Sequence, residues 1–218
     1  AGNTFATMLG QHGIAVTAPV ERAVAPPEAE VLGEVRSAPT AAVVERMLLA
    51  SDNDASEALA RHVALASGQP ASFDGVAGAL PSVMQSLGLD VAGLALADGS
   101  GLSRSNAIPP VLLVRLLALA TTSGHSELRP VLTGLPVGGF TGTLELRFDG
   151  EASASAGEVR AKTGTLNGVH TLAGTVEDVD GRLLTFAVMA DNAPVSAPLA
   201  AQDALDEVAA VLAACGCR

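Results

Sequence analysis

A predicted β-hairpin near the end of the chain constrains the fold most. Residues 171–191 read TLAGTVEDVDGRLLTFAVMAD, two apolar, β-branched runs on either side of the turn DVDG at 178–181. This pattern predicts two strands joined by a tight turn, and strands joined in this way are antiparallel. The amphipathic pattern of residues 199–214 then predicts a helix that covers one face of the sheet.

The pattern before residue 140 is helical instead. Apolar residues recur at helical spacing between typical helix-start and helix-stop residues. Helices are predicted at 2–12, at 41–50 with Thr40 as N-cap, at about 54–66, from Ser72 as N-cap to about Leu87, and after Pro109-Pro110. Two further extended segments are predicted, GTLELRF (142–148) and EVRAKTGTL (158–166). Helices first, a hairpin-built sheet next and a packing helix last predict an α+β fold, with a helical part at about 1–137 and a sheet with its helix at about 138–218.

The core must be built mainly from Ala, Val and Leu, because the chain has five Phe and neither Trp nor Tyr. Its 218 residues suffice for one sizeable core or two small ones. The formal net charge of −11 argues against nucleic acid as a partner, since phosphate binding needs a basic face. The best candidate for a membrane span, VLLVRLLALA at 111–120, is too short and contains Arg115.

The cysteines and histidines predict no metal site. Cys215 and Cys217 form a Cys-x-Cys pair with no second Cys/His pair to complete four ligands, and the four histidines are scattered. A disulfide, local or to a partner, is the simpler interpretation of the cysteines, and it fits an exported protein. The first residues, AGNTFATMLG, show neither an initiator Met nor a signal pattern, so we expect them to follow a cut. No cofactor is predicted.

Lys162 is the only lysine in the chain, beside eleven arginines. An exposed cation could be arginine at little cost, whereas a compact ammonium whose pKa responds to burial could not. The segment KTGT (162–165) is typical of an edge strand beside a cleft. There Gly164 lets a peptide ligand approach the backbone, and Thr163 and Thr165 present hydroxyl groups.

A second candidate motif, Ser51-Asp52-Asn53, follows the predicted helix at 41–50. Taken alone, SDN is typical of a helix end and loop. Its alternative role is to aim a hydroxyl and a carboxamide into a cleft. Ser-Asp-Asn and Lys-Thr-Gly are two of the three motifs that serine acyl-transfer enzymes of the penicillin-binding class combine, and here they occur in the same order.

The sequence resembles the penicillin-binding protein 4 type of D-alanyl-D-alanine carboxypeptidase/endopeptidase, peptidase family S13. The resemblance is carried by VRSAPTAAVVERMLLASDN, DGSGLSRSN (98–106), GTLELRF and VRAKTGTLNGVHTLAG, which together cover most of residues 31–175. It implies the penicillin-binding and serine β-lactamase-like transpeptidase fold. It also implies action on peptidoglycan stem peptides through an acyl-enzyme, binding of β-lactams and an extracytoplasmic location.

The resemblance also implies roles for individual residues. Ser51 and Lys162 would share proton transfer, and Asn53 would hold the substrate amide. Thr163 and Thr165 would bind the terminal carboxylate, and the backbone N–H of Thr165 would be one donor of the oxyanion hole. Gly164 would permit the strand-like approach of the ligand. Leu166 and Asn167 would contact the substrate side chain.

One part of the family pattern is absent, because the family's nucleophile lies in a Ser-x-x-Lys motif. Val159 stands three residues before the single lysine, so this chain has no such motif. We therefore expect the chain to be the C-terminal portion of one peptidase domain. Its partner would be an N-terminal half that carries the nucleophile, and the chain alone would be inactive.

Two alternatives to the peptidase stay open. A β-lactamase shares SDN and KTG but is disfavoured by DGSGLSRSN, and a non-catalytic penicillin-binding-like module would explain the absent serine. Other polar residues have simpler interpretations: a tight turn for Asp98 to Gly101, carboxylate pairing that holds loops for Arg104 and Arg147, and a packed strand position for His170.

Overall fold

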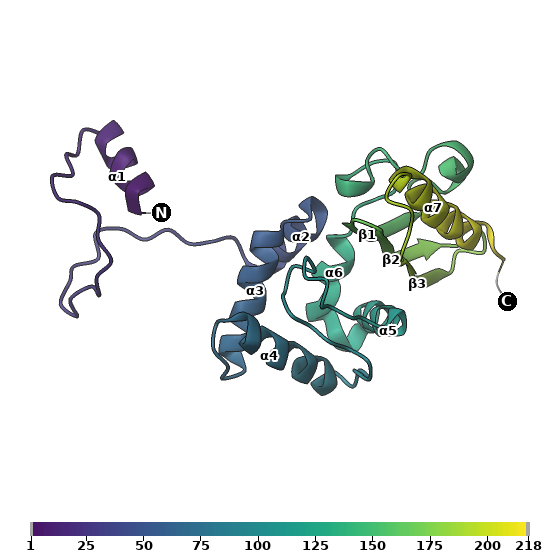
Figure 1. Ribbon diagram of the computed structural model, residues 1–218, viewed down its shortest axis with the longest axis horizontal. Helices are drawn as coiled ribbons and strands as arrows, with labels where there is room; N and C mark the ends of the chain where they lie inside the picture. Colours follow the sequence, from purple (N-terminus) through teal and green to yellow (C-terminus); the bar gives the residue numbers. More distant parts are fainter. Residues whose placement is uncertain (1, 217–218) are drawn as a thin grey trace. The chain divides into compact units, whose positions relative to one another are not determined.

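The structure, a computed structural model, describes residues 2–216. The chain divides into two compact units, Ala1–Ser37 and Ala38–Arg218, and Figure 1 labels their elements. The first unit contains helix α1 (Gly2–Gln11), which has no buried residue, and an irregular segment. All remaining elements belong to the second unit. The predicted disulfide involves Cys217, which lies outside the described residues.

The second unit begins with helices. They are α2 (Thr40–Ala50), α3 (Asn53–Ala66), α4 (Phe73–Ser86), α5 (Pro110–Ala120) and the short α6 (Arg129–Thr133). Ser72 caps α4 as predicted, because its hydroxyl accepts from the N–H of Gly75 at 3.1 Å. Thr40 is not the N-cap of α2: Pro39 holds that position and Thr40 is the first helical residue. Helices α3 and α4 pack together through a small cluster of Ala60, Ala64, Val76 and Ala79.

Three antiparallel strands form the sheet. They are β1 (Val159–Leu166), β2 (Val169–Glu177) and β3 (Leu183–Ala190), in the order β1-β2-β3. The predicted hairpin is confirmed as β2 and β3, with Gly174 opposite Phe186. The segment 158–166 is confirmed as β1, with Lys162 opposite Ala173. These strands and the helices form the predicted α+β fold.

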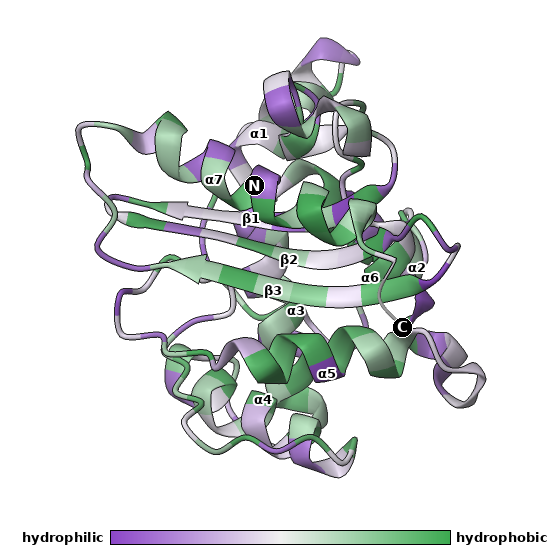
Figure 2. Ribbon diagram, turned by 90° about the vertical axis from the view of Figure 1, so that its right-hand side faces the viewer, coloured by the Kyte–Doolittle hydropathy of each residue, from purple (hydrophilic) through white to green (hydrophobic). Residues whose placement is uncertain are grey.

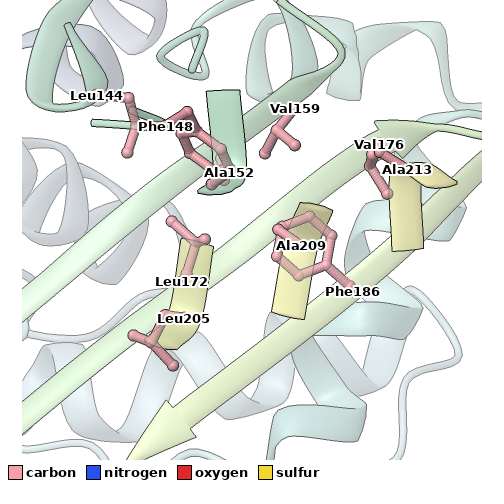
Figure 3. Close-up of a cluster of buried hydrophobic side chains, with 11 residues drawn as sticks. Leu144, Phe148, Ala152, Val159, Leu172, Val176, Phe186, Leu205, Ala209 and Ala213 are labelled. Carbon is pink, nitrogen blue, oxygen red and sulfur yellow. The ribbon is translucent and has the colours of Figure 1, made fainter. Parts of the chain in front are cut away.

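Helix α7 (Pro198–Ala214) closes the main core against the sheet. Leu172, Val176 and Phe186 project from β2 and β3 toward it and are buried together with residues of α7 (Figure 3). The members of this cluster are Leu144, Phe148, Ala152, Val159, Ala161, Leu172, Val176, Phe186, Leu205, Ala209 and Ala213. Helix α5 contacts β2 and β3 and lies on the other side of the sheet (Figure 2). Apart from Phe148 and Phe186, this core consists of Ala, Val and Leu, the residues that the composition predicts for it.

The segment 142–148 is not a strand, which corrects the sequence prediction. It starts with a 3-10 turn, η2 (Gly142–Leu144), and Phe148 has a positive φ of 61°. The alternation in GTLELRF would place Leu144, Leu146 and Phe148 on one face. Leu146 is instead 90% exposed while the other two are buried, because the chain turns to insert them separately into the core. The 3-10 segments η1 (Ser123–Leu128) and η3 (Gly150–Ser155) and helix α6 have no counterpart in the sequence prediction.

Length and polarity rule out a membrane-spanning role for every helix in the described part of the chain.

Candidate active site

Ser51 ends α2 in an unusual backbone conformation. Its φ and ψ angles of 53° and 48° lie in the left-handed region, which costs about 1–3 kcal/mol for a residue with a side chain. The turn is held by the N–H of Asp52, which donates to the carbonyl of Met47 at 3.0 Å. The interpretation of SDN as a helix end is thus confirmed, because Ser51 is the residue at which α2 ends. Strained residues of this kind concentrate at functional sites.

Lys162 and Ser51 are in direct contact. The Nζ of Lys162 donates to Ser51 Oγ at 2.7 Å and to the carbonyl oxygen of Thr163 at 2.8 Å. The fold therefore brings the SDN and KTG motifs together, one at the end of α2 and the other on β1. Burial lowers the pKa of Lys162, because the ammonium loses hydration. No carboxylate pairs with Lys162 among residues 2–216. Lys162 therefore loses its proton more readily than an exposed lysine does.

We expect the unfolding free energy of this chain to rise with pH at alkaline values below the ordinary lysine pKa. Because burial lowers the pKa of Lys162 in the folded state, the unfolded state binds more protons in that window, and stability increases with pH. Lys162 is the only lysine and the chain has no tyrosine, so few other groups interfere. Urea unfolding at pH values between about 8 and 10 should show this slope in the parent chain. A Lys162→Met variant with the same slope would contradict the assignment to Lys162.

Asp52 and Asn53 serve the start of α3 in different ways. The carboxylate of Asp52 accepts from the N–H of Ala55 at 2.9 Å and caps the helix. Asn53 is the first helical residue and is exposed. Its carboxamide has no hydrogen-bond partner among the described residues. The motif thus ends one helix, begins the next and leaves one amide available to a ligand.

Strand β1 is an edge of the sheet, and only the first half of its outer side is paired. The carbonyl of Val159 accepts from segment 136–138 and the N–H of Ala161 donates to that segment, both at 2.9 Å. Backbone groups alternate in direction along a strand, so those of Thr163 and Thr165 point to the same outer side. Beyond Ala161, no described backbone group pairs with that side. The KTG part of β1 therefore offers an open strand edge, as the sequence predicts.

The KTG side chains lie along this open half. The hydroxyl of Thr163 donates to Thr143 Oγ1 at 2.8 Å, whereas Thr165 is exposed. Leu166 is half-buried at the end of β1, next to the turn that contains the exposed Asn167. Sequence reasoning missed Thr143, because it lies in the segment predicted to be extended.

Gly164 has a close neighbour on the adjacent strand. A Cβ at this position would clash with the hydroxyl of Thr171, its partner on β2. This adds a second reason for glycine to the predicted one, close approach of a peptide to the backbone.

The DGSGLSRSN loop is a tight turn organised by Asp98, as predicted. The buried carboxylate accepts from the N–H groups of Gly101 at 2.8 Å and Ser103 at 2.6 Å, and from the amide of Asn106 at 2.7 Å. Burial by itself raises the pKa of Asp98. The hydrogen bonds, among them one from the Ser100 side chain, outweigh burial and lower the pKa overall.

Helix α3, which carries Asn53, also anchors this loop. Glu57 Oε1 accepts from the N–H groups of Gly99 and Ser100, both at 3.0 Å, and the hydroxyl of Ser56 donates to the carbonyl of Gly99 at 2.9 Å. The sequence analysis did not predict this contact. The only hint of it was that Glu57 follows Asn53 by one helical turn. The loop position is therefore fixed relative to Asn53.

The two arginines beside these motifs hold the structure in different ways. Arg147 pairs with the carboxylate of Asp206 at 2.6 Å, which confirms the predicted role. Arg104 has no carboxylate partner among residues 2–216. Its guanidinium donates instead to the carbonyl of Asn167 at 2.7 Å. This contact ties the DGSGLSRSN loop to the turn after β1. His170 is a buried residue of β2, as predicted, although its Nδ1 has no described partner.

No group of His, Cys, Asp and Glu residues in the described part of the chain is suited to hold a metal ion.

Comparisons with known proteins identify the class to which this fold and site belong. The profile of the D-Ala-D-Ala carboxypeptidase 3 (S13) family matches residues 1–212. The carboxypeptidase DacB of Mycolicibacterium smegmatis is 42% identical over 85% of this chain and 40% of that protein. The crystal structure of penicillin-binding protein 4 from Haemophilus influenzae, complexed with a β-lactam, has a TM-score of 0.78 at 27% identity and covers 95% of this chain and 50% of that one.

A class A β-lactamase from Bacteroides cellulosilyticus shares the fold more distantly, with a TM-score of 0.53 at 20% identity over 79% of this chain and 62% of that one. The fold is thus that of the penicillin-binding proteins and serine β-lactamases. The chain belongs to the D-Ala-D-Ala carboxypeptidase S13 family. It spans half or less of the length of the M. smegmatis and H. influenzae proteins that it matches.

Proposed function

We propose that this chain supplies the SDN and KTG parts of the active site of a serine D-Ala-D-Ala carboxypeptidase/endopeptidase. The enzyme acts on peptidoglycan stem peptides through an acyl-enzyme and is acylated by β-lactams. The observation that carries the proposal is the hydrogen bond from Lys162 to Ser51 beside an open strand edge. Membership of the S13 family, whose name states the D-Ala-D-Ala carboxypeptidase activity, supports it.

Each residue of the site has a proposed step. A serine outside this chain attacks the carbonyl that links the two D-alanines and forms the acyl-enzyme. Lys162 and Ser51 pass the proton to the leaving amine, which the lowered pKa of Lys162 favours. The N–H of Thr165, on the open side of β1, donates to the developing oxyanion. Asn53 orients the substrate amide.

The remaining KTG residues bind the substrate. The hydroxyls of Thr163 and Thr165 hold the terminal carboxylate, and Gly164 lets the peptide lie along β1. Leu166 contacts the substrate side chain at the end of the strand. None of these steps needs a cofactor.

The nucleophile is proposed to lie in an N-terminal half of the same enzyme, within a Ser-x-x-Lys motif. Residues 1–218 then form the C-terminal portion of a single peptidase domain. In the described part of the chain the outer edge of β3 has no strand partner, and an unpaired edge of this kind accepts another strand readily. Because its substrate is cell-wall peptide, we place the enzyme outside the cytoplasm.

Labelling with a fluorescent penicillin tests the proposal. The longer protein that contains this chain together with a Ser-x-x-Lys motif should be labelled and should release D-alanine from a D-Ala-D-Ala peptide. This chain alone, and the longer protein with that serine changed to alanine, should not be labelled. Rapid turnover of the penicillin would favour a β-lactamase instead. Absence of labelling in the longer protein would favour a non-catalytic module.

Thr163→Ala in the longer protein is expected to lower the second-order rate of penicillin labelling by roughly tenfold, because one hydrogen bond to a charged group is lost. Thr165 remains to hold the carboxylate, so the loss should be smaller than for a change at Lys162. The rate is measured from the time course of labelling at several penicillin concentrations. A loss as large as that of a Lys162 variant would show that the two threonines do not share the carboxylate.

A further inference from the structure

Thr143 lies beside the KTG strand and has a hydrogen-bond donor to spare. The hydroxyl of Thr163 donates to Thr143 Oγ1 at 2.8 Å. A threonine hydroxyl can accept and donate at the same time, and no other hydrogen bond involves the Thr143 side chain among the described residues. Its residue is exposed. A ligand at Thr163 therefore meets the free O–H group of Thr143 next to the hydroxyl of Thr163.

The fold fixes the turn that carries Thr143. Gly142 has a φ of +57°, and a side chain there would clash with the carbonyl of Leu49 in the last turn of α2. On the other side of Thr143, Leu144 is fully buried in the main core. The turn η2 is thus held between the helix end that carries Ser51 and the core below the sheet.

The turn is also continuous with the segment that covers the first half of β1. The hydroxyl of Thr141 accepts from the N–H of Val137 at 2.9 Å, and the N–H of Gly139 donates to the carbonyl of Leu144 at 2.9 Å. Val137 in turn pairs with Arg160 of β1. The position of Thr143 relative to Thr163 is therefore set by backbone contacts on both sides, so the hydroxyl pair is held in place before a ligand arrives.

We propose that Thr143 is a third carboxylate-binding residue of the site, acting with Thr163 and Thr165 on the terminal carboxylate of the substrate. A carboxylate offers about four acceptor positions on two oxygens, so adjacent hydroxyls can donate to it together. The ammonium of Lys162, which binds Ser51 and the carbonyl of Thr163, adds a positive charge nearby. This inference rests on the proposed function, because it assigns Thr143 to the same substrate.

The test compares two ligands that differ only at the carboxylate. The longer enzyme is assayed with a short acyl-D-Ala-D-Ala peptide and with its C-terminal amide. Thr143→Val should lower kcat/KM for the free acid by roughly tenfold, the effect also expected for Thr163→Ala, since each loses one hydrogen bond to a charged group. It should leave the value for the amide unchanged, and Thr143→Ser should restore most of the loss. Thr122→Val, at an exposed threonine after α5, is the matched control and should change neither value.

Equal losses for the acid and the amide would overturn the inference, since they would show that Thr143 only supports the turn. Failure of Thr143→Ser to recover the acid-specific activity would also overturn it. If the enzyme hydrolyses neither peptide, the proposed function fails. The role of Thr143 is then decided by the affinity for the free-acid peptide, measured by titration calorimetry. In that case weaker binding of the acid by Thr143→Val supports the role, and unchanged or undetectable binding in the parent and the variant overturns it.

Discussion

Replacing Lys162 with arginine in the longer enzyme is expected to lower the rate of acylation by penicillin about 10²–10⁴-fold, the usual effect of losing a positioned proton-transfer group. The Nζ of Lys162 lies between Ser51 Oγ and the carbonyl of Thr163, at 2.7 and 2.8 Å. A guanidinium is larger than the ammonium and stays protonated at any working pH, so it cannot take part in proton transfer. The second-order rate of fluorescent-penicillin labelling measures the effect.

Arg160 provides the matched control for this prediction. It lies two residues earlier on β1, and its side chain is exposed. Arg160→Lys should leave both the labelling rate and the far-UV circular dichroism spectrum unchanged. If Lys162→Arg is labelled as fast as the parent enzyme, the single lysine is an accident of composition and the proposed site is wrong.

Asp206→Ala is expected to lower the free energy of unfolding by about 3–5 kcal/mol, because it leaves a buried guanidinium without its counter-charge. Arg147 donates to both carboxylate oxygens of Asp206, at 2.9 and 2.6 Å, and the two side chains are only 12% and 5% exposed. The pair fixes the turn before η3 to helix α7. Urea unfolding followed by circular dichroism measures the effect, since the chain has no tryptophan to report it.

Two variants separate the buried charge from a simple loss of contact. Arg147→Met combined with Asp206→Ala removes both charges and should recover part of the lost stability. Glu34→Ala breaks the exposed pair with Arg36, whose side chains are 63% and 87% exposed, and should change stability by less than about 1 kcal/mol. A double variant no more stable than Asp206→Ala would show that the buried charge is not the cause.

The β-hairpin and the helices were predictable from the sequence because their signals are local. Turn residues at 178–181 separate two apolar runs, and Ser72 caps α4 with its own side chain. The segment 142–148 was predicted wrongly for the opposite reason. Its alternation is local, but the contacts that decide its shape are distant, namely the packing of Leu144 into the core and the pairing of Arg147 with Asp206 on α7.

The site was predictable only in part. The motifs SDN and KTG stand out in the sequence, and the resemblance to a family placed them together. The left-handed conformation of Ser51 was not predicted, because a left-handed residue after a helix is usually Gly or Asn rather than Ser. Thr143 and Glu57 were missed because their importance lies in partners 20 and 42 residues away, Thr163 and Gly99.

If a peptide pairs with β1 as we propose, the segment 136–138 sets the point at which that pairing must end. It occupies the outward backbone positions of β1 up to Ala161, so only Thr163 and Thr165 remain as outward positions. Since outward positions recur every second residue, a peptide can pair with β1 over about three residues before it meets this segment. A chain end can stop there, whereas an unbroken polymer would have to bend away from the sheet. On this proposal, the backbone of segment 136–138 would favour a peptide end over the middle of a chain, independently of any side chain.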